Sequence, residues 1–142
     1  MQASWINWAL LSAFFAALTA IFAKIGVREI DSDLATLLRT FVVVIALTAL
    51  VIGTHKWTNP VELPNKTLLF LVLSGLATAA SWLCYFRAIQ LGPVSLVAPI
   101  DKFSVVLVAV FAYAMLGERL TGREWIGIAL VTAGVAVISF RK

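Results

Sequence analysis

Long runs of apolar residues fill almost the whole chain, and only short polar breaks separate them. An α-helix rises ~1.5 Å per residue, so about 20 apolar residues are needed to cross a hydrocarbon core ~30 Å thick. The runs have this length, and they are too continuously apolar for the alternating strands of a membrane barrel. The sequence therefore predicts an all-α membrane protein with five transmembrane helices, over approximately Ala3–Ala23, Leu34–Ile52, Thr67–Ala88, Val94–Leu116 and Thr121–Phe140.

The composition supports a membrane protein and excludes a soluble one. Hydrophobic residues make up 62% of the chain, charged residues 13%, and the mean hydropathy is +1.01. Soluble domains are about 45–50% apolar and ~25% charged. The net charge of +4 is spread over every polar break instead of forming a basic patch, so we expect no nucleic-acid partner. We expect a single domain over residues 1–142.

Motifs of enzymes and ATP-driven pumps are missing from the sequence. It contains neither a phosphate-binding glycine-rich loop nor a His-Glu metal pair nor a usable Ser/His/Asp set. We therefore expect a protein that is not an enzyme, with no cofactor and no metal site.

The polar breaks hold residues that end or begin helices. Asp31, Ser32 or Asp33 could cap the second helix by accepting hydrogen bonds from its free amides. An odd number of crossings places the two termini on opposite sides of the membrane.

The basic residues of the breaks are balanced between the two sides. Orientation follows mainly from Lys/Arg asymmetry in short loops, so this balance permits either a weak preference for a cytoplasmic C-terminus or insertion in both directions. Each side carries four basic loop residues, namely Lys56, Lys66, Arg119 and Arg123 on one side and Lys24, Arg28, Arg141 and Lys142 on the other.

Five helices are few for enclosing a solute path. Many secondary transporters place the site between two repeats of opposite orientation. Two oppositely inserted copies would recreate that arrangement, which predicts a homodimer, and an antiparallel one if both insertions occur. A monomer or a parallel dimer is the alternative.

Asp101 and Lys102 are charged residues inside the fourth predicted helix. A charge at membrane depth costs roughly 2.5–3.5 kcal/mol on insertion scales. A charged residue there therefore indicates a functional site. If the helix begins near Pro93, Asp101 lies about 12 Å into it. Adjacent helical residues point about 100° apart, so we expect each to need a partner elsewhere. Arg39 and Arg87 are candidate counter-ions for Asp101.

The embedded charges have two interpretations. Asp101 and Lys102 could line a central cavity and change protonation or pairing as a solute binds, with Arg39 balancing the charge. Alternatively they could form a buried structural ion pair that locks the helices together.

Three further residues are candidates for the site. Pro99 lacks an amide donor, so it either kinks the fourth helix beside Asp101, freeing the carbonyl near Ser95, or marks the true start of that helix. Trp82 and Tyr85 lie inside the third helix, where they could stack on a cation or an apolar solute, or simply fill the core.

Several stretches resemble the EamA domain of the drug/metabolite transporter superfamily. The resemblance covers nearly the whole chain, and its most specific part is the Leu-Gly-Glu-Arg-Leu segment with the glycines downstream. Its residues are Tyr85 to Pro99, Leu116 to Thr121, Gly127, Gly134 and Val135, with Lys24 and Arg39 also at matching places.

The resemblance implies a function. Most members of that family are tandem repeats of ten helices that export small metabolites, and this chain is similar to one half, like the single-domain members. We therefore expect a homodimeric secondary exporter of small polar or amphipathic metabolites in the inner membrane of a prokaryote, working by alternating access with proton coupling or exchange. The alternatives are a lipid-carrier flippase and a non-transporting membrane subunit or assembly factor. Asp101 and Lys102 depart from the apolar residues usual in the family.

Overall fold

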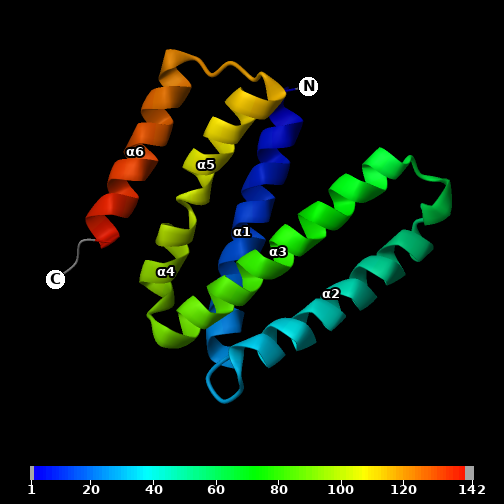
Figure 1. The fold of residues 1–142 in the computed structure, drawn as a ribbon. Helices are drawn as coiled ribbons and strands as arrows, with labels where there is room; N and C mark the ends of the chain where they lie inside the picture. The colour runs from blue at the N-terminus through cyan, green and yellow to red at the C-terminus, as the bar shows by residue number, and fades with distance from the viewer. Residues whose placement is uncertain (1, 140–142) are drawn as a thin grey trace. The chain divides into compact units, whose positions relative to one another are not determined.

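The structure is a computed structural model that describes the backbone of residues 2–139 and the side chains of residues 5–60 and 62–139. All regular structure in this part of the chain is helical (Figure 1). The elements are α1 (Gln2–Gly26), α2 (Ser32–Gly53), η1 (Pro60–Glu62), α3 (Asn65–Leu91), α4 (Val94–Asp101), α5 (Ser104–Phe111), η2 (Ala112–Leu116) and α6 (Gly122–Ser139).

Within residues 2–139, five helical segments are long and apolar enough to cross a membrane, which confirms the predicted all-α membrane fold. Helices α1 and α3 each extend three residues beyond their predicted C-terminal ends, Ala23 and Ala88. Backbone groups pair within a helix, so the helix favours continuing to the headgroup level. Phe140, the predicted end of the last helix, lies outside the described residues.

The chain forms two compact units, and the boundary between them in the sequence falls between Leu91 and Gly92. The N-terminal unit contains α1, α2, η1 and α3, and the C-terminal unit contains α4, α5, η2 and α6. In the N-terminal unit α3 packs against both α2 and α1, which diverge from their connecting loop (Figure 1). The packing of this unit is therefore tightest at the α1–α2 loop.

Hydrogen bonds tie the C-terminal end of α3 to the α1–α2 loop. The last carbonyls of a helix have no partner inside it. The Lys24 ammonium donates to the carbonyl of Ile89, and the Gln90 amide donates to the carbonyls of Val27 at 3.3 Å and Ile30 at 3.0 Å. Val27 and Ile89 are fully buried beneath these bonds. This end of the unit is a small packed core.

The N-terminal end of α2 is capped by Asp31, one of the three predicted candidates. Its carboxylate accepts hydrogen bonds from the amides of Asp33 at 2.8 Å and Leu34 at 3.3 Å. The cap satisfies amides that have no partner inside the helix, so it holds the start of α2 against the core.

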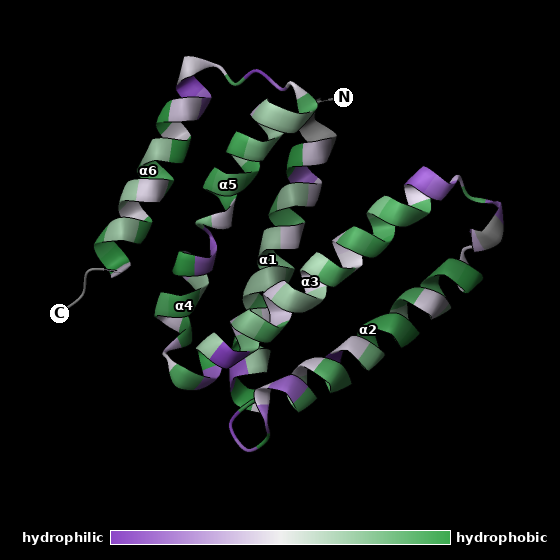
Figure 2. Ribbon diagram, in the orientation of Figure 1, coloured by the Kyte–Doolittle hydropathy of each residue, from purple (hydrophilic) through white to green (hydrophobic). Residues whose placement is uncertain are grey.

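The fourth span, Val94–Leu116, is interrupted in the middle. Helix α4 ends at Asp101 and α5 begins at Ser104. Across the break the amides of Lys102 and Phe103 donate at 3.0 Å to carbonyls three residues back instead of four. Figure 2 shows this break as a hydrophilic interruption between α4 and α5.

Helix α6 packs against α4 and α5 within the C-terminal unit. Before it, the fourth span ends in the wider turn η2, and Gly117 follows with a φ of 69° that disfavours other residues. Thr121 immediately precedes α6, and its amide and hydroxyl donate to the Glu124 carboxylate at 2.6 and 2.9 Å. The sequence pattern Thr-x-x-Glu signals this cap.

Candidate functional site

Arg39 lies in α2 against two aromatic rings of α3. Its guanidinium carbon is 3.9 Å from the centroid of the Trp82 ring and 5.5 Å from that of Phe86. Residues four apart share one face of a helix, so the packing of α2 on α3 presents both rings to the same cation. Arg39 is seven residues after Ser32, or about 10 Å along the helix. It is a charge held at membrane depth by aromatic faces.

The aromatic contacts replace part of the water that Arg39 loses. A cation over a ring face gains about 0.5–2 kcal/mol, with the larger values where water is excluded. The guanidinium is half-buried, and among the described side chains none of the carboxylates lies within 4.0 Å of it. Its N–H groups are therefore available to an acceptor from outside the protein.

Tyr85 lies one residue before Phe86 on α3. Its ring meets the Phe86 ring edge to face, with the centroids 6.5 Å apart, and its phenol is near enough to Arg39 to interact with it electrostatically. The Tyr85 side chain is half-buried.

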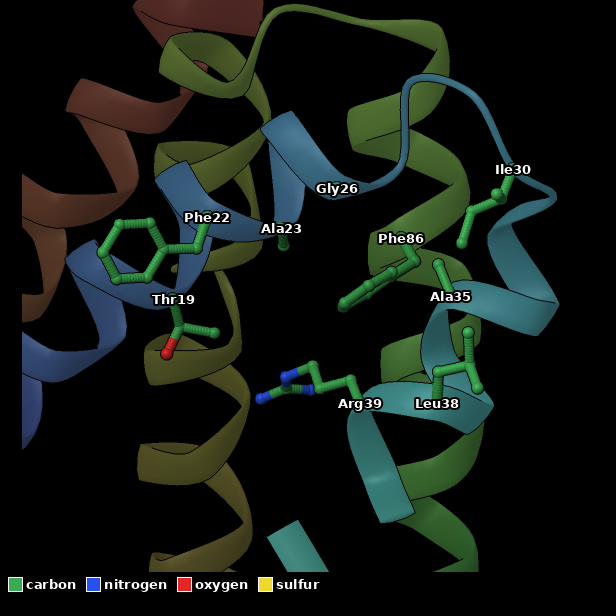
Figure 3. A pocket seen from close by; sticks show the side chains of 9 residues that line it. All are labelled: Thr19, Phe22, Ala23, Gly26, Ile30, Ala35, Leu38, Arg39 and Phe86. Atoms are coloured by element: carbon green, nitrogen blue, oxygen red, sulfur yellow. The ribbon is translucent and has the colours of Figure 1, made fainter. Parts of the chain in front are cut away.

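A cavity of about 340 Å³ opens beside Arg39 in the N-terminal unit. Figure 3 shows the Arg39 side chain extending from α2 toward α1. The cavity forms because α1 and α2 diverge, and Figure 3 shows Phe86 of α3 between the residues of these two helices. Its lining residues are Thr19, Phe22, Ala23 and Gly26 of α1, Ile30 of the loop, Ala35, Leu38 and Arg39 of α2, and Phe86 of α3.

Asp101 and Lys102 form an ion pair in the C-terminal unit. The Lys102 ammonium is 3.5 Å from the Asp101 carboxylate, and the two side chains are 59% and 38% exposed, respectively. The expectation that these neighbours could not pair is wrong. It assumed a continuous helix, whereas α4 ends at Asp101 and the backbone turns at Lys102. The Pro99 alternative is also resolved, because α4 begins at Val94 and Pro99 lies inside it.

The helix end at the break favours Lys102. The C-terminal end of a helix carries partial negative charge. Lys102 caps the C-terminal end of α4, so its ammonium group is beside a helix end of opposite sign. Asp101 is the last residue of α4, and its charge is compensated by the Lys102 ammonium.

The predicted site residues fall into two groups. Arg39, Trp82 and Tyr85 come together in the N-terminal unit, and Asp101 and Lys102 come together after Pro99 in the C-terminal unit. A pairing of Arg39 with Asp101 stays a prediction.

Several cavity residues were not predicted from the sequence. The four-residue spacing of Trp82 and Phe86 is a usable signal for Phe86. Thr19, Phe22 and Leu38 show no such signal, because they are ordinary residues of apolar helices.

Helices that cross a membrane, with charges at membrane depth beside a helix break, are the features of a membrane transport protein. The chain belongs to the EamA-like transporter family, whose model matches residues 3–140. This confirms the predicted resemblance and a transporter in place of an enzyme. The chain is an integral membrane protein with five spans among its described residues.

Two similar proteins come from bacteria. The chain is 54% identical over 139 residues to a Sinorhizobium sp protein named "Uncharacterized transporter in cobO 3'region", covering 98% of this chain and 99% of the relative. It is 32% identical over 76 residues to "Probable 4-amino-4-deoxy-L-arabinose-phosphoundecaprenol flippase subunit ArnE" of Yersinia pestis (strain Pestoides F), covering 54% of this chain and 67% of the relative. No solved structure matches the chain.

Proposed function

We propose that this chain is a secondary transporter that exports small polar or amphipathic metabolites as a homodimer by alternating access. A proton gradient or an exchanged solute drives it, since the sequence lacks a phosphate-binding loop for ATP. Its relatives are bacterial, which supports a place in the cytoplasmic (inner) membrane of a prokaryote. Residues 1–142 act as one EamA-like domain.

The observation that carries this proposal is the interruption of the fourth span at Asp101 and Lys102. At this break tighter turns with bonds to carbonyls three residues back replace the regular α-helical bonds. Irregular backbone inside the bilayer is tolerated where it borders protein or a water-filled cavity. An ion pair with substantial exposure sits at this break. Both features favour a polar path over dry packing, because an exposed charge in hydrocarbon is costly.

Arg39 is a further charged residue inside a membrane span, seven residues after the start of α2 at Ser32. A charge inside a span is costly unless it has a function or a partner. We assign Asp101, Lys102 and Arg39 to solute binding or coupling.

Two aromatic residues and one proline complete the proposed site. Trp82 and Tyr85 shape the wall beside Arg39, and Pro99 maintains the break in the fourth span.

The dimer rests on the size of the chain and on its outer surface. In many transporters, alternating access uses two repeats around one site. This chain contains one such domain, so a second copy would supply the other repeat. Large apolar side chains are exposed along the spans of both units, where lipid or a second copy would cover them. The balanced loop charges support an antiparallel pair.

Reconstituted liposomes test the transport function. Liposomes that contain the purified protein are loaded with radiolabelled amino acids and small organic acids, and efflux is followed under an imposed proton or solute gradient. We expect gradient-driven flux that falls at least about tenfold in Lys102→Ala and in Asp101→Asn, equivalent to about 1.4 kcal/mol of barrier. Lys56→Ala, in the loop after α2, is the matched control and retains flux. Full flux in both embedded variants, with helix content unchanged, would refute the site.

The likeness to a flippase subunit favours a second candidate. In that case the chain pairs with a different membrane protein and moves a lipid carrier, as the name of the Yersinia pestis relative states for that protein. The chain purified alone would then be monomeric and inactive, and flux of a lipid-linked sugar would need the second protein. A non-transporting assembly role would give no flux under either condition. A homodimer that transports without another protein excludes both alternatives.

A further inference from the structure

The cavity of the N-terminal unit is large enough to hold a small molecule. Ligand sites commonly measure about 300–1,000 Å³ and are apolar with a few polar groups that orient the ligand. The cavity volume of about 340 Å³ is at the small end of that range. Its walls are mostly hydrocarbon, with the Arg39 guanidinium and the Thr19 hydroxyl as the polar side-chain groups (Figure 3).

The charge of Arg39 selects the kind of ligand. A guanidinium stays protonated and donates in a planar fork that fits the two oxygens of a carboxylate or phosphate. Trp82 covers one face of this fork, and among the described side chains none of the carboxylates lies within 4.0 Å of it. The aromatic contact leaves the N–H edges unoccupied. A cationic ligand would be repelled, and a neutral one would leave these donors without an acceptor.

We propose that this cavity binds an amphipathic anion, with its carboxylate or phosphate at Arg39 and its apolar body against Phe22, Leu38 and Phe86. The inference rests on the proposed transport function, because it names the chemical class of the transported solute. Two sources share this chemistry, a free metabolite and the headgroup of an anionic lipid. The first experiment below tests the class, and a lipid arm separates the sources.

A charge series with one apolar body tests the class. Radiolabelled 4-phenylbutyrate is bound to purified full-length protein in a non-ionic detergent and followed by a scintillation proximity assay. The competitors are unlabelled 4-phenylbutyrate, 4-phenylbutanol and 4-phenylbutylamine. We expect the acid to compete about tenfold or more strongly than the alcohol, as a charge-assisted hydrogen bond predicts, and the amine to compete least. Equal competition by acid and alcohol would overturn the proposal.

Variants test the cavity itself. Arg39→Gln should weaken binding of the acid about tenfold and remove its advantage over the alcohol, whereas Arg39→Lys should keep part of that advantage. Gly26→Leu places a side chain in open space of the cavity, since a Cβ there meets nothing within 4 Å. Gly53→Leu is its matched control, because Gly53 also ends a helix, also has open space, and does not line the cavity. Undiminished binding in both Arg39→Gln and Gly26→Leu would refute the cavity as the site.

The lipid arm uses phosphatidylglycerol and phosphatidylcholine as competitors. Displacement of the labelled acid by phosphatidylglycerol alone identifies a lipid headgroup as an occupant, and no displacement by either identifies a free metabolite. Equal displacement by both lipids would argue against recognition of charge. This measurement is separable from transport, because flux without anion binding refutes only this inference, and anion binding without flux refutes only the transport function.

Discussion

The N-terminal unit keeps its embedded charge on an unbroken helix against aromatic rings, whereas the C-terminal unit interrupts a helix beside its charged pair. Arg39 lies over Trp82 and near Phe86 in a pair of packed helices. Asp101 and Lys102 lie where α4 ends, and their charges are balanced by each other.

The difference indicates different mechanical roles. Helix α3 of the N-terminal unit is held at its C-terminal end by hydrogen bonds from Lys24 and Gln90 over a buried core. The fourth span lacks regular α-helical hydrogen bonds in its middle. Rotating α4 relative to α5 therefore costs less free energy than bending a continuous helix. We expect the N-terminal unit to hold its cavity rigidly and the fourth span to change shape during transport.

The largest effect should come from the core of the N-terminal unit. Ile89→Ala removes a fully buried side chain beneath the α1–α2 loop, and such changes cost about 2–5 kcal/mol. Val108→Ala in α5 is the matched control, because that side chain is 63% exposed and should change stability little. Denaturant unfolding in detergent micelles measures both. Equal losses in the two variants would contradict a packed core around Ile89.

Removing the proline should have the next largest effect, and it should separate stability from function. Pro99→Ala restores a donor for the carbonyl of Ser95 and allows α4 to continue through Lys102. We expect stability to rise by as much as about 3 kcal/mol and solute flux to fall about tenfold. Unfolding and proteoliposome flux are measured on the same preparation. Unchanged flux would show that the break is not part of the transport cycle.

The smallest expected effect concerns the ring beneath Arg39. Trp82→Leu keeps an apolar side chain but removes the aromatic face, at a cost of about 0.5–2 kcal/mol. Trp82→Phe keeps a face and should lose less. Thermal unfolding of the two variants gives the comparison, and a greater loss in the phenylalanine variant would count against the cation–π contact.

Sequence patterns predicted the membrane helices well and their ends less well. The start and end of the fourth span, Val94 and Leu116, are as predicted, because a Gly-Pro pair and a glycine bound it. The predicted end of α1 was too early at Ala23, because a polar residue such as Lys24 can remain helical when it hydrogen-bonds another helix. Composition does not record such a partner.

The candidate site was predicted in part. Their charge inside predicted membrane helices identified Arg39, Asp101 and Lys102 as unusual. In the structure Arg39 lies over the Trp82 ring, and Asp101 and Lys102 form an ion pair. Their partners were not predictable, because the Asp101–Lys102 contact depends on a helix end between them, and the cation over Trp82 depends on how α2 packs on α3. The cavity was missed, since its lining residues look like any lipid-facing ones.

The order and length of the membrane helices follow from the amino-acid sequence alone. In lipid each apolar run must satisfy its own backbone hydrogen bonds, and this is a local requirement that local composition reveals. The cavity beside Arg39 depends instead on packing between distant parts of the chain, such as Gln90 against Val27, 63 residues earlier. That geometry comes from side-chain fit between helices, which a single run of residues does not specify.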